Sequence, residues 1–206
     1  MAGQTKLYFF DARARGEISR LVLAAGGKPW EDVRVAGGEE WQKKTKPTTP
    51  FGTVPVLDIG GKQYGQSLAI ASYLAKQYGL YGSSPLEELV IDEVQQLRED
   101  LFRNEAAHFN EKDEKVKAEK AKVLKEETYP RYLGYFTKIL KDNGNVFVVG
   151  KKVSLADLVI LESTTTLIQN VPGLLDKYPE LKAHRERTSQ VPGVKEYLAK
   201  RPTQPI

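Results

Sequence analysis

The character of this chain changes once, close to Tyr81. Before that point, short runs with the composition of strands alternate with segments whose apolar residues recur at helical spacing. Beyond it, the periodicity is helical, and no run resembles a strand as clearly. The turn-forming residues Gly82–Pro85 mark the join. We therefore predict two domains, one spanning 1–81 and an all-helical one spanning 82–206.

The first domain is predicted to follow the order strand, helix, strand, hairpin, helix. A strand–helix–strand unit must cross over to a parallel neighbour, and a hairpin then adds antiparallel strands. Gly60–Gly61, between two apolar runs, is a good signal for the hairpin turn. The result is a mixed four-stranded sheet of the thioredoxin-like type. The expected strands are Lys6–Phe10, Val33–Val35, Val54–Ile59 and Lys62–Tyr64, and the expected helices are Arg15–Ala25 and Ser67–Ala75, with a loop containing one irregular helix at Gly37–Pro50.

Helical periodicity covers most of the second domain. One of its helices starts with Ser154 and Asp157 in a variant capping box, in which both side chains satisfy free backbone amides. The residues that follow are very apolar, so this helix should lie in the core. The expected helices are Leu86–His108, Asp113–Asn143, Ser154–Asn170, Pro179–Gln190 and Val194–Lys200.

Composition excludes several classes of function. The sequence has no cysteine, which excludes disulfides, thiolate metal sites and cysteine-based catalysis. Its two histidines, His108 and His184, stand apart from any carboxylate pattern with metal-ligand spacing, so no metal is expected. The net charge of +4 comes from basic residues interleaved with acidic ones, which argues against a nucleic acid partner. With no long apolar run and no signal-like start, we expect a cytoplasmic protein without a membrane partner.

Two segments of the first domain carry a specific pattern. Pro50–Leu57 reads PFGTVPVL, and Gln66–Ala71 reads QSLAIA. Together with Lys6–Leu7, Arg13–Glu17 and Ser154–Leu158, they resemble the cytosolic glutathione S-transferases of the sigma class along nearly the whole chain. The resemblance implies the fold of that family, an α/β thioredoxin-like domain followed by an all-α domain. It also implies glutathione as co-substrate, no metal, a hydrophobic electrophile as second substrate, and a homodimer.

The two specific segments contain most of the expected glutathione contacts. From the residues alone, Pro55 is an ordinary trans-proline on an edge strand. The resemblance instead implies a cis bond, which would turn the backbone of Val54 outward to pair with the cysteinyl part of glutathione, and it adds Thr53 as a contact. Gln66 and Ser67 begin a helix, where amides, dipole and hydroxyl suit the γ-glutamyl carboxylate. Plain N-capping by Ser67 is the simpler alternative, and both roles can coexist.

The glycyl end of glutathione is expected to meet the loop before Pro50. By resemblance, Trp41 and Lys46 would contact it, with Lys46 opposing its carboxylate. Because this loop is longer than is usual in the family, Lys43 and Lys44 are rivals for that role.

Two further positions imply the homodimer. Asp100 matches an acidic residue that reaches the γ-glutamyl amine bound to the partner subunit, and a surface carboxylate is the alternative. Phe51 matches a position that often packs into the partner, and the alternative is a partly buried loop aromatic.

The end of the first strand presents a difficulty. In the family, a tyrosine hydroxyl there holds the glutathione thiol as thiolate through a charge-assisted hydrogen bond. Counting back without a gap from Arg13, Arg15 and Glu17 places Phe9 at this position, and Tyr8 then points to the opposite face. Either a one-residue bulge or insertion between Phe9 and Arg13 brings Tyr8 into the site as the catalytic residue, or the protein works without the phenol, partly compensated by the charge of Arg15. Loss of the phenol would cost roughly ten- to a hundred-fold in rate.

Three functions are therefore weighed. The leading one is conjugation, in which the thiolate attacks an electrophile held between the two domains near Leu101–Phe109, a detoxification reaction. Glutathione-dependent prostaglandin isomerisation is the second. The third is a weakly active or inactive binding protein resembling a lens crystallin, and Phe9 is the feature that favours it.

Overall fold

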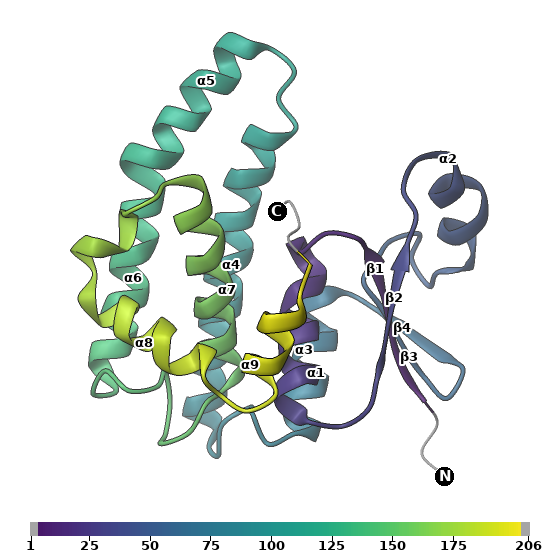
Figure 1. Ribbon diagram of the computed structural model, residues 1–206, viewed down its shortest axis with the longest axis horizontal. Coiled ribbons are helices and arrows are strands. Elements are labelled where there is room, and N and C mark those ends of the chain that lie inside the picture. Colours follow the sequence, from purple (N-terminus) through teal and green to yellow (C-terminus); the bar gives the residue numbers. More distant parts are fainter. Residues whose placement is uncertain (1–3, 203–206) are drawn as a thin grey trace. The chain divides into compact units, whose positions relative to one another are not determined.

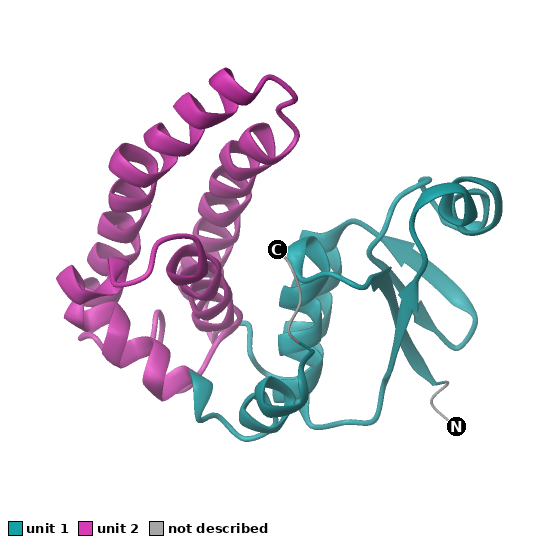
Figure 2. Ribbon diagram, turned by 45° about the horizontal axis from the view of Figure 1, so that its top comes forward, with its two compact units in different colours: residues 1–81, 189–206 teal, residues 82–188 magenta. Residues whose placement is uncertain are grey.

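The computed structural model describes residues 4–202, whose elements are shown in Figure 1. These residues form two compact units (Figure 2). The first contains the chain up to Tyr81 together with the segment from Ser189 onward, and the second contains Gly82–Thr188.

The first unit is built on a mixed four-stranded sheet. Its strands lie in the order β2-β1-β3-β4, with β1 and β2 parallel and the other neighbours antiparallel. This arrangement confirms the predicted thioredoxin-like sheet. The strands are β1 Thr5–Phe10, β2 Glu31–Val35, β3 Val56–Ile59 and β4 Lys62–Gly65.

Two helices, α1 (Glu17–Gly26) and α3 (Ser67–Gln77), pack together on one face of this sheet (Figure 1). Apolar side chains of both helices and of the sheet are completely buried there, as Leu21 and Leu57 illustrate. A short helix, α2 (Gly38–Glu40), lies on the other side of the sheet and continues through a π-helical turn at Trp41–Thr45 and a 3-10 turn at Lys46–Thr48. The predicted irregular loop is thus mostly helical.

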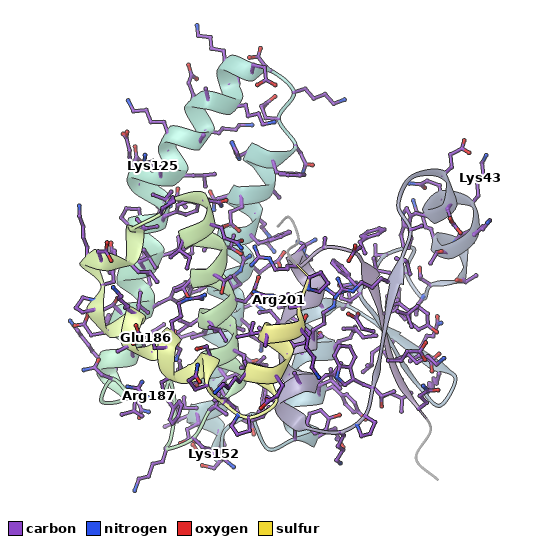
Figure 3. All side chains as sticks on the ribbon, viewed as in Figure 1. Lys43, Lys125, Lys152, Glu186, Arg187 and Arg201 are labelled. Atoms are coloured by element: carbon purple, nitrogen blue, oxygen red, sulfur yellow. The ribbon has the colours of Figure 1, made fainter. Side chains whose placement is uncertain are left out.

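The helix α9 (Val194–Lys200) belongs to the first unit, whereas the sequence placed this segment in the helical domain 82–206. It packs on α1, where Glu17 accepts hydrogen bonds from Tyr197 at 3.0 Å and from Arg201 at 2.8 Å. Figure 3 shows Arg201 where the chain leaves α9. A contact between the two ends of the chain leaves no trace in local periodicity, which explains the difference.

The second unit is helical throughout its regular elements. The sequence predicted one helix over Asp113–Asn143, and the structure forms it as α5 and α6 joined by a π-helical turn at Leu124–Thr128. The helix α7 is buried on all sides along Leu155–Leu167, as predicted for the apolar helix. The helices are α4 Pro85–Phe109, α5 Glu114–Val123, α6 Tyr129–Asp142, α7 Leu155–Asn170 and α8 Pro179–Ser189.

The capping box at the start of α7 is present. The Asp157 carboxylate accepts hydrogen bonds from the backbone and hydroxyl of Ser154, both at 2.7 Å, and from the amide of Val148 at 2.8 Å. It also lies 2.8 Å from Nε2 of His184, and both side chains are completely buried. Asp157 therefore joins three separate segments of the helical unit.

Two classes of feature are not found between residues 4 and 202. No helix there combines the length and the apolar character needed to cross a bilayer. Nor do His, Asp and Glu side chains gather in groups of three that could hold a metal ion.

Candidate functional site

The register of the sheet brings the separate site segments to one edge. Tyr8 pairs with Val56, and Val56 pairs with Gly65. Because β1 runs antiparallel to β3 and β3 antiparallel to β4, the next row across the sheet contains Phe9, Pro55 and Gln66. Three residues that are separate in the sequence therefore follow one another along the same edge, just beyond the last paired residues of the strands.

Phe9 lies on the face of the sheet covered by α1. Its side chain is 5% exposed, and its ring packs so closely on Gly16 that a Cβ at Gly16 would lie 2.5 Å from the ring atoms Cγ and Cδ1. Only glycine leaves room for the ring at this position. The guanidinium of Arg20 in α1 lies 5.6 Å from the centroid of the same ring.

Tyr8 lies on the opposite face of the strand. The pairing of β1 with β2 is unbroken from Lys6 to Phe10, so neighbouring side chains alternate regularly. Phe10, on the face of Tyr8, meets the ring of Trp41 edge-on at a centroid distance of 5.1 Å. The strand contains no bulge that would move Tyr8 to the face of Phe9.

The peptide bond between Val54 and Pro55 is cis, as the resemblance implied. The ladder between β1 and β3 ends at the pair Tyr8–Val56, so Val54 lies just beyond it. Pro55 is buried, Val54 is half-buried and Thr53 is exposed. The backbone of Val54 is thus placed at the end of a strand, where an extended peptide can add to the sheet.

The helix α3 begins at the same edge with Ser67. Gln66, directly before it, has a positive φ of 76° and an exposed side chain. The first amides of a helix have no partner within the helix and carry the positive end of its dipole. With the adjacent hydroxyl of Ser67, they form a suitable site for a carboxylate.

The two arginines of the turn between β1 and α1 differ in exposure. Arg15 is exposed in the 3-10 turn Ala14–Gly16, whereas Arg13 is 1% exposed. The structure therefore keeps the side chain of Arg15, the predicted compensating charge, accessible to solvent.

The cationic loop residues are oriented by local contacts. Lys46 donates to Gln42 at 3.4 Å, while Lys43 and Lys44 pair with Glu39 and Glu40 one helical turn away. Among the described contacts, Lys43 and Lys44 are therefore each paired with a carboxylate, whereas the partner of Lys46 is a neutral amide.

The two positions linked to the homodimer are both accessible. Phe51 is 64% exposed, and its ring covers Gly65, where a Cβ would lie 2.7 Å from it. Asp100 belongs to α4 in the second unit and lies 3.3 Å from Nη1 of Arg103. Within the first unit, the structure therefore gathers Phe9, Val54, Pro55, Gln66 and Ser67 at one edge, and Asp100 is not part of that group.

The domains of this chain also match known families. A model described as "Glutathione S-transferase, N-terminal domain" matches residues 16–84, and one described as "Glutathione S-transferase, C-terminal domain" matches residues 99–201. The chain belongs to the glutathione S-transferase family. It is an enzyme of that family, because curated relatives named glutathione S-transferase are 34–38% identical to it over nearly the whole chain. One of them, glutathione S-transferase 1 of Ascaris suum, is 36% identical over 98% of both chains.

Solved structures agree in fold. A sigma class glutathione S-transferase of Fasciola hepatica is 32% identical, with a TM-score of 0.89 and coverage of 98% of this chain and 99% of that one. Prostaglandin synthase D of Nilaparvata lugens is 34% identical, with a TM-score of 0.88 and coverage of 97% and 99%. Glutathione S-transferase 3 of the hookworm Necator americanus, described as monomeric, is 32% identical, with a TM-score of 0.85 and coverage of 98% and 100%.

Sequence reasoning missed two charged residues close to the candidate site, because Arg20 contacts the ring of Phe9 and Glu17 pairs with Arg20. Both are completely buried in α1. The available signal was an acidic and a basic residue at i,i+3 spacing in an otherwise apolar helix. Such a pair is usually solvent-exposed, so the spacing alone could not reveal its position.

Proposed function

We propose that this glutathione S-transferase binds glutathione at the edge formed by Phe9, Pro55 and Gln66, and transfers it to a hydrophobic electrophile. The observation that carries the proposal is the row itself, which joins a strand end, a cis-proline and a helix N-terminus on one side of the sheet. A cytoplasmic detoxification role and membership of the sigma class are parts of the same proposal, and the similarity to the Fasciola protein supports the class.

In this proposal, glutathione lies extended along the sheet edge. The backbone of Val54 pairs with the cysteinyl residue, and Thr53 lies beside it. The γ-glutamyl carboxylate meets Gln66, Ser67 and the first amides of α3. Trp41 and Lys46 contact the glycyl end, where the ammonium of Lys46 opposes the second carboxylate.

The thiol lies, in this proposal, on the side of the sheet where Phe9 and α3 are located. Tyr8 points to the other side, so we propose that Phe9 and not Tyr8 occupies the position of the phenol. The thiolate is then stabilised by the positive charge of Arg15 and by the backbone of the turn between β1 and α1. Its sulfur forms a bond to an electrophilic carbon, the leaving group departs with the bonding electrons, and the thiol proton passes to solvent.

We propose a homodimer in which Asp100 reaches the γ-glutamyl amine bound to the partner subunit. The exposed aromatic side chain of Phe51 supports a buried position between subunits, because a large apolar side chain gains free energy when it leaves water. The monomeric hookworm relative makes the oligomeric state a direct question for sedimentation of the purified protein.

Two other functions have specific support. Glutathione-dependent prostaglandin isomerisation is favoured by the similarity to the Nilaparvata protein. A binding or lens-crystallin-like role with little activity is favoured by Phe9, which lacks a hydroxyl.

Equilibrium binding of glutathione, combined with conjugation of an aryl halide, tests the proposal. We expect saturable binding and slow but measurable conjugation. Binding without any turnover would contradict the transferase function and favour a binding protein. An absence of binding would contradict the proposed site.

A further inference from the structure

A buried arginine, Arg20, donates hydrogen bonds to the turn between β1 and α1. The side chain of Arg20 in α1 is completely buried. Its Nη1 donates to the carbonyl of Ala12 at 2.6 Å, and its Nη2 donates to the carbonyl of Phe10 at 3.2 Å. The same guanidinium lies over the ring of Phe9. One side chain thus contacts the ring of the candidate site and both carbonyls that flank Asp11.

A second arginine, Arg34, binds the side chain of Asp11, the residue between those two carbonyls. Arg34 of β2 donates from Nη1 to the carboxylate of Asp11 at 2.7 Å. Asp32 joins the two arginines, because its Oδ1 accepts from Nε of Arg20 at 3.1 Å and its Oδ2 lies 2.7 Å from Nη2 of Arg34. The turn is therefore held at three points by charge-assisted hydrogen bonds, which are stronger than neutral ones.

The charge of Arg20 is balanced on its other side by Glu17. The Oε2 atom of Glu17 lies 3.4 Å from Nη1 of Arg20, and its Oε1 atom accepts from Arg201 and Tyr197. A buried carboxylate is tolerated only when such partners surround it. The end of α9, labelled at Arg201 in Figure 3, therefore supports Glu17 and, through it, Arg20.

We propose that Arg20 is a positioning residue for the glutathione thiol, and that α9 contributes to this through Arg201 and Glu17. The inference rests on the proposed function. With phenylalanine at position 9, stabilisation of the thiolate depends on the dipoles and charges of the turn, and electrostatic stabilisation requires groups that are already in place. The contacts proposed for the rest of glutathione lie on Val54 and Ser67, outside the turn. Movement of the turn should therefore impair the chemical step more than binding.

The variant Arg20→Lys tests this most directly. Lysine keeps the charge but lacks the planar group that reaches several acceptors at once. We expect kcat to fall about 5- to 20-fold, with less than about a twofold change in the Kd of glutathione, because misplacement affects the reaction before it affects affinity. The pKa of the bound thiol should rise. A matched control is Arg187→Lys, since Arg187 is an exposed arginine that donates to a loop carbonyl, that of Val146, in the helical unit.

A second readout does not depend on glutathione. Amide hydrogen exchange at residues 11–14, measured by NMR, should be faster in Arg20→Lys and, to a smaller extent, in Arg201→Gln. If Arg20→Lys does not fold, Arg201→Gln carries the same test, because it changes a partly exposed residue at the end of the network. A failure of the wild-type protein to bind glutathione would contradict the proposed function while leaving this exchange test valid. Unchanged exchange and unchanged kcat in a folded variant would overturn the positioning role.

Discussion

The ring of Phe9 rests directly on the backbone of Gly16, with no space for a β-carbon between them. This contact fixes the ring on the face of the sheet covered by α1, while Tyr8 lies on the other face. If Phe9 occupies the position of the phenol, as proposed above, this glutathione S-transferase has a phenyl ring without a hydroxyl at that place.

Adding a hydroxyl to the ring of Phe9 should increase the rate of conjugation. In Phe9→Tyr, the ring keeps its contact with Gly16 and gains a hydroxyl at its far end. A hydrogen bond to the thiolate is worth about 1.5–3 kcal/mol, so conjugation should become roughly ten- to a hundred-fold faster. The measurement is kcat/KM with an aryl halide at fixed glutathione concentration. Tyr8→Phe is the matched control and should change the rate less than about twofold, since its ring faces away. Loss of activity in Tyr8→Phe would show that the phenol of Tyr8 reaches the thiol.

The hydroxyl of Ser67 should contribute to the affinity for glutathione. Ser67→Ala removes one donor to the proposed carboxylate and leaves the amides of α3 in place. We expect a Kd about tenfold weaker, since a hydrogen bond to a charged group is worth about 1.5–3 kcal/mol and water replaces part of it. Isothermal titration calorimetry measures the Kd of glutathione in both proteins. The control is Thr137→Ala in α6, which removes a hydroxyl that donates a hydrogen bond to the carbonyl of Leu133. It should not alter the Kd of glutathione. An unchanged Kd in Ser67→Ala would show that Ser67 serves only the helix.

Much of the fold could be predicted because it depends on local signals. The hairpin turn at Gly60–Gly61 and the capping box at Ser154 each act within a few residues, and the structure contains both. The alternation of side chains along β1 likewise predicted that Tyr8 and Phe9 lie on opposite faces. The cis bond at Pro55 required the resemblance, since the residues alone favoured trans.

The remainder depends on contacts between distant segments. The sequence placed α9 in the helical domain because nothing local reveals that Arg201 meets Glu17. The buried position of Arg20 was missed for the same reason, because a charged residue in a helix is exposed by default. Its burial depends on contacts with distant residues such as Phe10 and Asp32. Local patterns therefore predicted most of the elements, and the candidate site residues remain predictions. The tertiary contacts show which residues support the turn between β1 and α1.

Loss of the Asp157 carboxylate should strongly destabilise the protein. Its removal leaves the amides of Val148 and Ser154, and the ring of His184, without their buried acceptor. We expect Asp157→Ala to lower the free energy of unfolding by about 3–5 kcal/mol, the range found when one partner of a buried charged network is removed. Urea denaturation followed by far-ultraviolet circular dichroism measures it. The exposed Asp142, paired with Lys138, offers the control, and Asp142→Ala should cost less than about 1 kcal/mol. Equal losses in the two variants would contradict the role assigned to Asp157.

The docking of α9 should produce a specific dependence on alkaline pH. Burial, together with the negative charge of Glu17, raises the pKa of the Tyr197 phenol. The folded protein therefore keeps this proton at pH values where the unfolded chain releases it, near pH 10. The contribution of Tyr197 to stability is complete below about pH 10 and is lost as the pH rises above it, by at most about 1.4 kcal/mol per pH unit. The urea concentration at the midpoint of unfolding, measured between about pH 8 and pH 11, should fall less steeply with pH in Tyr197→Phe than in the wild type. Identical slopes would show that the phenol is accessible to hydroxide in the folded protein.

The pKa of the glutathione thiol in the bound state, determined by ultraviolet difference titration, tests the central claim most directly. The titration is carried out on the wild type, Tyr8→Phe and Phe9→Tyr. If Phe9 occupies the position of the phenol, the wild type and Tyr8→Phe share one pKa, somewhat below that of the free thiol, and Phe9→Tyr gives a lower one. A raised pKa in Tyr8→Phe, with no change in Phe9→Tyr, would contradict the account and assign the activation of the thiol to Tyr8.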